Sequence, residues 1–163
     1  MNEILALERE FDRIGALLAI EPDATTARAE KVSGWSVAEQ VDHMLKVVLA
    51  QVDRLAERRP VKRGINLVGR IVLLRGRIPR GVGKSPERVL PAPRPRAELV
   101  EQLAAARGRL AALAADAELR ADPRPLAPHP YFGGLTPRQA LRFLAIHTDH
   151  HLRIVADIRR AAG

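Results

Sequence analysis

The stretch from residue 136 to residue 161 reads TPRQALRFLAIHTDHHLRIVADIRRA, and it is the most informative part of the chain for the fold. Thr136 and Gln139 form a capping box with Pro137 at the first helical position, so we expect a helix to begin there. Along the stretch, one set of positions recurs at spacings of three and four residues, as on one face of an α-helix. These positions are Ala140, Leu144, His147, His151, Ile154 and Ile158. The pattern predicts a long helix whose inner face carries two histidines.

Three other stretches show the same periodicity. They are residues 3–19, the residues from a capping box at 36–39 to just before Pro60, and residues 97–119. No stretch alternates apolar and polar residues with the period of a strand, so we expect no sheet. Four helices with sustained spacings of three and four predict an all-α protein, a four-helix bundle that forms a single domain over residues 1–163.

The composition excludes several classes of site. The chain has 163 residues and no cysteine, which excludes disulfides, thiolate metal sites and a cysteine nucleophile of its own. Aromatic residues make up 3%, which argues against base-stacking platforms for single-stranded nucleic acid. No apolar run approaches the roughly 20 residues of a membrane-spanning helix, and the charged N-terminal stretch does not resemble a signal peptide. We therefore expect a cytoplasmic protein.

Positive charge is concentrated in the long connection between the second and third predicted helices. The formal net charge is +8, and residues 60–96 hold ten basic residues and one acidic residue. Within this basic connection, residues 64–78 predict a short amphipathic helix on the bundle or against a partner, and the Gly- and Pro-rich residues 79–95 predict irregular structure. The charge leaves open a non-catalytic binding module whose 60–96 segment docks an anionic partner, either nucleic acid or a membrane surface.

Two histidines stand in the middle of an apolar stripe, where buried imidazoles need partners. His147 and His151 lie one helical turn apart, and burial lowers a histidine's pKa, which leaves neutral rings with free lone pairs. Neutral histidines at i and i+4 are a familiar pair of metal ligands, so the pair fits a divalent-metal site as well as it fits two satisfied core residues. His43 lies at the shoulder of the second helix, between Val47 and the polar Gln40, where pocket walls are often built.

Four further residues are candidates for supporting or lining a pocket: Gln40, His129, His150 and Tyr131. His129 precedes a proline, which favours a role in packing a turn, and His150 is turned about 100° from its neighbour on the helix, toward a supporting or surface position. We expect Tyr131 to pack at a rim.

The remaining polar and aromatic candidates are expected outside the site. Trp35 is expected to anchor the start of the second helix by packing. Asp149 is expected in solvent, and Asp42 on the side of its helix away from the stripe. The sequence therefore offers no acidic fourth ligand or general base.

Three segments together resemble the DinB/YfiT-like superfamily. WSVAEQVDHM at 35–44 resembles its second-helix signature, HTDHHLR at 147–153 resembles its HxxxH signature, and HPYFGGLT at 129–136 resembles the lead-in of an uncharacterised subgroup. The resemblance covers essentially the whole domain and implies a four-helix bundle with a divalent metal, commonly zinc or nickel. It also implies that His43, His147 and His151 hold this metal. The long basic connection departs from compact members and could reshape the mouth of the pocket.

The resemblance also implies an activity. Members with known activity include S-transferases and isomerases that use low-molecular-weight thiols such as bacillithiol or mycothiol, others are described as metal-dependent hydrolases, and homodimers are frequent. It thus implies a metal-dependent transferase or hydrolase that acts on a small molecule, as a homodimer. Because the chain has no cysteine, a thiol nucleophile would have to come from outside as a co-substrate. A closed, four-ligand structural metal site is a further possibility.

Overall fold

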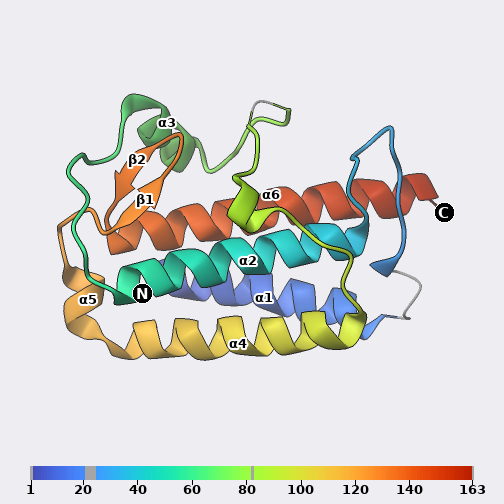
Figure 1. Cartoon of the computed structure of the whole chain (residues 1–163), viewed down its shortest axis with the longest axis horizontal. Coiled ribbons are helices and arrows are strands. Elements are labelled where there is room, and N and C mark those ends of the chain that lie inside the picture. The colour runs from blue at the N-terminus through green and yellow to red at the C-terminus, as the bar shows by residue number, and fades with distance from the viewer. Residues whose placement is uncertain (1, 21–24, 82, 163) are drawn as a thin grey trace.

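The four long helices form a bundle in which α1 and α6 run in one direction and α2 and α4 run in the other (Figure 1). They are α1 (Asn2–Ala19), α2 (Val37–Ala56), α4 (Arg96–Ala115) and α6 (Pro137–Ala162). The computed structural model describes residues 2–20, 25–81 and 83–162. In the bundle α1 and α2 each pack against both α4 and α6. The predicted four-helix bundle is confirmed, and none of its described helices is long and apolar enough to cross a bilayer.

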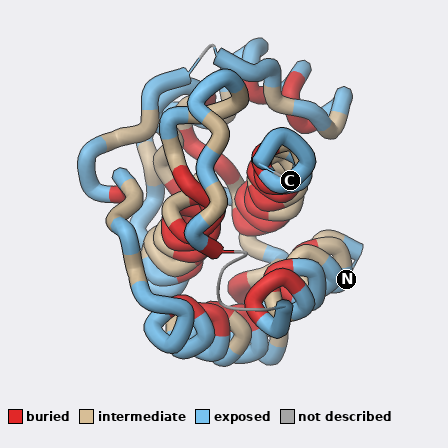
Figure 2. Tube along the Cα trace, turned by 90° about the vertical axis from the view of Figure 1, so that its right-hand side faces the viewer, coloured by how far each residue is buried: buried red, intermediate tan, exposed pale blue. Residues whose placement is uncertain are grey.

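The core lies where the predicted stripes of the four helices meet. Figure 2 shows buried residues on the sides of the helices that face one another and exposed residues on the outside. The largest fully buried side chains include Leu7, Phe11, Ile14, Leu45, Leu99, Leu110 and Leu144. Each such side chain contributes about 1.5–3 kcal/mol when it leaves water, so this core is the main stabilising feature of the bundle.

Both predicted capping boxes are present, and they set where α2 and α6 begin. The Ser36 Oγ accepts from the Glu39 N–H at 3.3 Å, and the Glu39 carboxylate accepts from the Ser36 N–H at 2.7 Å. Thr136 and Gln139 exchange the same two bonds at 3.3 and 3.0 Å. Because side-chain direction in a helix follows from where the helix begins, these caps also fix the direction of the histidines that follow.

Two of the expectations about secondary structure are wrong in detail. The third predicted helix is broken at Asp116, whose side chain accepts from the Leu119 N–H and so begins a separate helix, α5 (Ala117–Ala121). A small antiparallel sheet, β1 (Ala127–His129) and β2 (Gly133–Leu135), precedes α6, although no sheet was expected. Strands of three residues are too short for the alternation of apolar and polar residues to be detected.

The predicted short helix in the basic connection is present as α3 (Leu67–Arg75), which packs on α6. Gly76 ends it in a left-handed conformation, with φ 63°. The side that faces the bundle buries Gly69, Val72 and Leu73. The outer side is also largely apolar, so the helix is less amphipathic than the sequence predicts; its exposed apolar residues are Leu67, Val68, Ile71 and Leu74.

After α3, the chain crosses α2 and α6 before it reaches α4 (Figure 1). We call residues 76–95 the crossing segment. It contains the 3-10 turn η2 (Glu87–Val89), and its other described residues are irregular, as predicted; Val82 lies outside the described residues. Arg80 pairs with Asp157 of α6 at 2.7 Å and holds the early part of the segment to the bundle. The segment thereby covers a face of α2 that a bare four-helix bundle would leave in solvent.

Candidate metal centre

Three histidines from two helices meet beneath the crossing segment. His43 comes from α2, and His147 and His151 come from successive turns of α6. One ring nitrogen of each residue lies within 4.8 Å of the others, and the Nε2 atoms of His43 and His147 are 3.3 Å apart. We call these three residues the histidine triad. The predicted pair on α6 and His43 of α2 are thus brought together.

Hydrogen bonds behind two of the rings determine which nitrogen is free. The Nδ1–H of His43 donates to the Val89 carbonyl of η2 at 2.7 Å, and the Nδ1–H of His151 donates to the Gln40 Oε1 at 2.6 Å. A carbonyl oxygen can only accept, so both protons are on Nδ1 and both Nε2 atoms carry a lone pair. Outer hydrogen bonds of this kind orient histidines that bind metals.

The spacing of His43 and His147 fits a metal ion better than a strong hydrogen bond. A separation of 3.3 Å between Nε2 atoms is long for a strong hydrogen bond between nitrogens. It matches the roughly 3.3 Å between two ligands of a tetrahedral zinc with bonds of about 2.0–2.1 Å. His147 also has a buried Nδ1 without a hydrogen-bond partner among the described residues, a cost of about 1–3 kcal/mol for a merely structural histidine. The three residues could therefore hold a divalent ion.

Burial keeps the triad neutral. Loss of hydration lowers the pKa of His43, although its bond to the Val89 carbonyl opposes this effect. Burial, followed by the proximity of the other imidazoles, lowers the pKa values of His147 and His151 well below their ordinary value. Neutral imidazole is the form that binds a metal, so the fold prepares the lone pairs without competition from protons near neutral pH.

The triad opens into a cavity of about 580 Å³, the size of a site for a small molecule. Its walls are mostly apolar and aromatic. Trp35 does more than anchor the start of α2, as its ring centroid lies 5.0 Å from that of His43 and 6.3 Å from that of His151. In the described part of the chain, no carboxylate and no fourth histidine joins the triad within ligand distance. An ion held here would therefore keep a coordination position for a molecule in the cavity, unlike a closed structural site.

The other predicted pocket residues all line this cavity. Gln40 supports His151 directly. His129 packs the hairpin turn as predicted, because its Nδ1 accepts from two backbone N–H groups and its ring stacks on Phe132 at 4.0 Å. Tyr131 is 48% exposed at the rim, and His150 lies beside His151 with ring centroids 5.1 Å apart.

Comparison with known families agrees with this geometry. A family model described as the DinB superfamily matches residues 6–155. The chain belongs to the DinB superfamily. The matched range contains all three histidines of the triad, the whole of α2, and α6 as far as Val155. No curated protein and no solved structure matches the chain.

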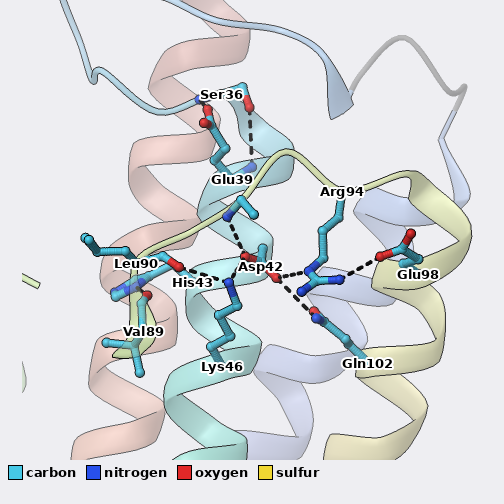
Figure 3. A network of polar contacts seen from close by, with 11 residues as sticks. Ser36, Glu39, Asp42, His43, Lys46, Val89, Leu90, Arg94, Glu98 and Gln102 are labelled. Atoms are coloured by element: carbon cyan, nitrogen blue, oxygen red, sulfur yellow. Dashed lines mark hydrogen bonds and ion pairs between the residues drawn. The ribbon is translucent and has the colours of Figure 1, made fainter. Parts of the chain in front are cut away.

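Asp42 is not part of the triad, as expected, but the face of α2 on which it lies is covered by other parts of the chain. In this DinB superfamily protein, Asp42 is fully buried, one residue before His43. Its carboxylate accepts from the Ala92 N–H at 2.8 Å and the Arg94 Nε at 2.8 Å, and it pairs with the Lys46 Nζ at 2.7 Å (Figure 3). Burial raises the pKa of Asp42, but these bonds outweigh burial and leave it below its ordinary value. Helical periodicity could not reveal this role, because the crossing segment covers that face of α2.

Asp149 also differs from its expectation of lying in solvent. Its side chain is 23% exposed, and its carboxylate pairs with Arg13 of α1 at 2.8 Å and with Arg153 of α6 at 2.6 Å. The acid is therefore part of the contact between α1 and α6. It is not among the residues that line the cavity.

Gln40 should act through His151. We expect Gln40→Leu to weaken zinc affinity about 10- to 100-fold, because His151 loses the acceptor that orients its ring. Competition with a chelating dye measures this change. Gln51→Leu is the matched control, since Gln51 is also a buried glutamine of α2 but donates to the Pro128 carbonyl. An equal loss in the two variants would show that Gln40 has no special role.

The buried histidines should make the metal-free protein sensitive to acid. Burial lowers the pKa of His129 to about 4 and those of the triad below the ordinary value of about 6.5. As the pH falls below about 6.5, these histidines take up protons in the unfolded chain but not in the folded one. Protonation therefore stabilises the unfolded state relative to the folded state. We expect the free energy of unfolding to fall by at least about 2 kcal/mol between pH 7 and pH 5.

Urea unfolding of metal-free protein at the two pH values measures this loss. His147→Leu has one buried imidazole fewer, so it should lose less stability than the wild type over the same range. Equal or greater stability of the wild type at pH 5 would contradict the prediction.

Proposed function

We propose that this protein is a metal-dependent transferase that joins a low-molecular-weight thiol to a small electrophilic molecule. The histidine triad at the end of a cavity without carboxylates carries the proposal. His43, His147 and His151 would hold a divalent ion, zinc or nickel, which when bound lowers the pKa of a coordinated thiol or water. The chain has no cysteine, so the thiol is a co-substrate.

The cavity favours thiol transfer over hydrolysis. A hydrolase gains from a general base that accepts a proton from water. Among the described residues that line the cavity, none is Asp or Glu, and the two histidines outside the triad are weak bases because burial lowers their pKa values. A thiol of pKa about 8.5 gives up its proton far more readily than water, so it needs no such base. Metal-dependent hydrolysis is the alternative outcome of the test.

The test combines elemental analysis with a thiol-transfer assay. The protein as purified is analysed for zinc and nickel and is then supplied with bacillithiol or mycothiol and monochlorobimane. In the reaction, sulfur forms a bond to the bimane carbon, chloride leaves with the electrons of the C–Cl bond, and the thiol proton goes to water. We expect about one metal per chain and thiol-dependent fluorescence that His147→Ala abolishes. Absence of metal, or cleavage of 4-nitrophenyl acetate without thiol transfer, would overturn the proposal.

A second candidate function rests on the outer side of α3. Leu67 and Leu74 are 72% and 82% exposed, and exposed arginines lie on and just after the same helix: Arg70, Arg75 and Arg77. Apolar side chains with flanking cations are suited to an anionic lipid surface, whereas two copies of this face would bring like charges together. We infer that α3 could dock the protein on such a membrane. The homodimer stays a prediction.

Vesicle sedimentation separates the possible partners of this face. We expect binding to phosphatidylserine-containing vesicles, weaker binding to pure phosphatidylcholine, and a loss of binding in Leu67→Gln/Leu74→Gln. Leu90→Gln/Val100→Gln is the matched control, because those exposed apolar residues lie outside α3. Binding to duplex DNA instead, or a dimer that the α3 variant dissociates, would overturn the membrane assignment.

A further inference from the structure

Two cations at the cavity have no carboxylate partner. Lys84 and Arg88 of the crossing segment are the charged residues that line the cavity, and neither forms an ion pair within the described residues. Arg80 and Arg94 of the same segment do, with Asp157 and with Asp42. No described acidic residue lines the cavity. The cavity therefore has an uncompensated positive charge beside apolar walls, which attracts anions.

Lys84 and Arg88 reach the cavity from different positions of the crossing segment. The Tyr131 hydroxyl donates to the Lys84 carbonyl at 2.8 Å and accepts from the Lys84 N–H at 2.9 Å, which fixes Lys84 against the hairpin turn. Arg88 belongs to η2 and precedes Val89, whose carbonyl accepts from His43. The backbone of Lys84 is thus fixed beside the hairpin, and Arg88 directly precedes the residue that supports the triad.

His129 adds a neutral hydrogen-bond donor on the hairpin side. Its Nδ1 accepts from the N–H groups of Tyr131 and Phe132, both at 3.2 Å. The ring proton is therefore on Nε2, which is left to donate to a molecule in the cavity that His129 lines. Because burial lowers the pKa of His129 to about 4, the ring stays neutral and keeps this donor near neutral pH.

An aromatic wall joins the hairpin side to the triad. The Phe143 ring centroid lies 4.6 Å from that of His129 and 5.4 Å from that of His147. Phe143 is buried and lines the cavity together with aliphatic residues of α2, α3 and α6; these are Val47, Val68, Val72 and Ile154. A molecule that reaches from His129 to the triad therefore needs an apolar body.

We propose that the cavity binds a small organic anion with an apolar body, its anionic oxygens held by Lys84, Arg88 and the His129 Nε2–H and its body resting on Phe143. This inference deepens the proposed function, because it rests on the cavity being the substrate site and specifies the class of molecule that enters it. The anion itself can be the electrophilic substrate or the thiol co-substrate.

The test compares two probes with one body in the metal-free protein, so that no metal–carboxylate bond contributes. The probes are 4-phenylbutyrate and the neutral 4-phenylbutan-1-ol, each titrated by calorimetry at low ionic strength. We expect the carboxylate to bind about 10-fold more tightly than the alcohol, a preference that added salt reduces. Equal affinities, or no measurable binding of 4-phenylbutyrate, would overturn the inference.

A pair of variants assigns the preference to the two cations. Lys84→Gln/Arg88→Gln should weaken 4-phenylbutyrate about 10-fold and change the alcohol less than 2-fold. Arg63→Gln/Arg75→Gln removes the same charge from residues of the basic connection that do not line the cavity, and it should leave both probes unchanged. Equal losses in the two variants would show only a general effect of net charge and would contradict the proposed site.

The result is separable from that of the thiol assay. Anion preference in the metal-free protein without any metal-dependent turnover would overturn the proposed function and leave the anion site standing. Thiol transfer by a protein that binds both probes equally would support the proposed function and overturn the anion site.

Discussion

A His147→Ala variant should bind zinc at least about 100-fold more weakly than the wild type. Loss of a hydrogen-bond partner behind a metal ligand already lowers metal affinity about 10- to 100-fold, and loss of the ligand itself should lower it further. The Nε2 of His147 lies 3.3 Å from that of His43, and its ring lies between those of His43 and Phe143. Two histidines would remain, and one of them, His151, would lose the neighbouring ligand one helical turn away. Competition with a chelating dye at pH 7 measures the affinity.

His150→Ala is the control for this prediction. His150 lies on the same helix, its ring contacts that of His151, and it lines the same cavity, but it is outside the triad. We expect its zinc affinity to change less than 3-fold. Unchanged affinity in His147→Ala, or equal losses in the two variants, would remove the basis for a metal at this position.

The metal-free form of a His147 variant provides an independent readout. The buried Nδ1 of His147 has no partner among the described residues, so this ring lowers the stability of the fold. We therefore expect metal-free His147→Leu to melt at or above the temperature of metal-free wild type. A site that is kept for binding rather than for packing should show this opposition between affinity and stability.

Asp42→Ala should lower the free energy of unfolding by about 3 kcal/mol, as expected when one member of a buried charge network is removed. The fully buried carboxylate accepts from or pairs with Lys46, Ala92, Arg94 and Gln102, and all of these lose their shared partner (Figure 3). Urea unfolding of the metal-free protein measures the loss.

Asp53→Ala is the matched control for Asp42. Asp53 also lies on α2 and pairs with an arginine, Arg109, but both side chains are 49% exposed. Exposed pairs contribute about 0–1 kcal/mol, so little stability should be lost. Zinc affinity should fall in Asp42→Ala alone, because Asp42 holds the segment whose Val89 carbonyl orients His43. Similar effects of the two variants would contradict a special role for the buried acid.

The helices and the paired histidines could be predicted because they depend on local sequence. Spacings of three and four residues and the two capping boxes determine where each helix lies and which way His147 and His151 point. The hairpin and the break at Asp116 escaped prediction, because strands of three residues have no detectable period and an aspartate in a helical pattern does not by itself reveal a cap.

The supports of the site could not be predicted, because a distant part of the chain supplies them. Periodicity placed Asp42 away from the core and His43 at a shoulder, and both expectations assumed a bare helix. The crossing segment covers that face, gives Asp42 its partners and brings the Val89 carbonyl to His43. A backbone carbonyl has no signature in a sequence, since every residue carries one.

The crossing segment also constrains how insertions and deletions can be tolerated. At one end of the stretch from Val89 to Arg94, the Val89 carbonyl accepts from His43, and at the other end Arg94 donates to Asp42. A change of length in this stretch would therefore shift the His43 ring. Between Arg80 and Val89, the described residues are bonded to the hairpin through Lys84 and Tyr131. Length changes in that earlier part would alter which molecules are admitted while the ion-binding end stays intact, so new specificities could arise there at little cost to the rest of the fold.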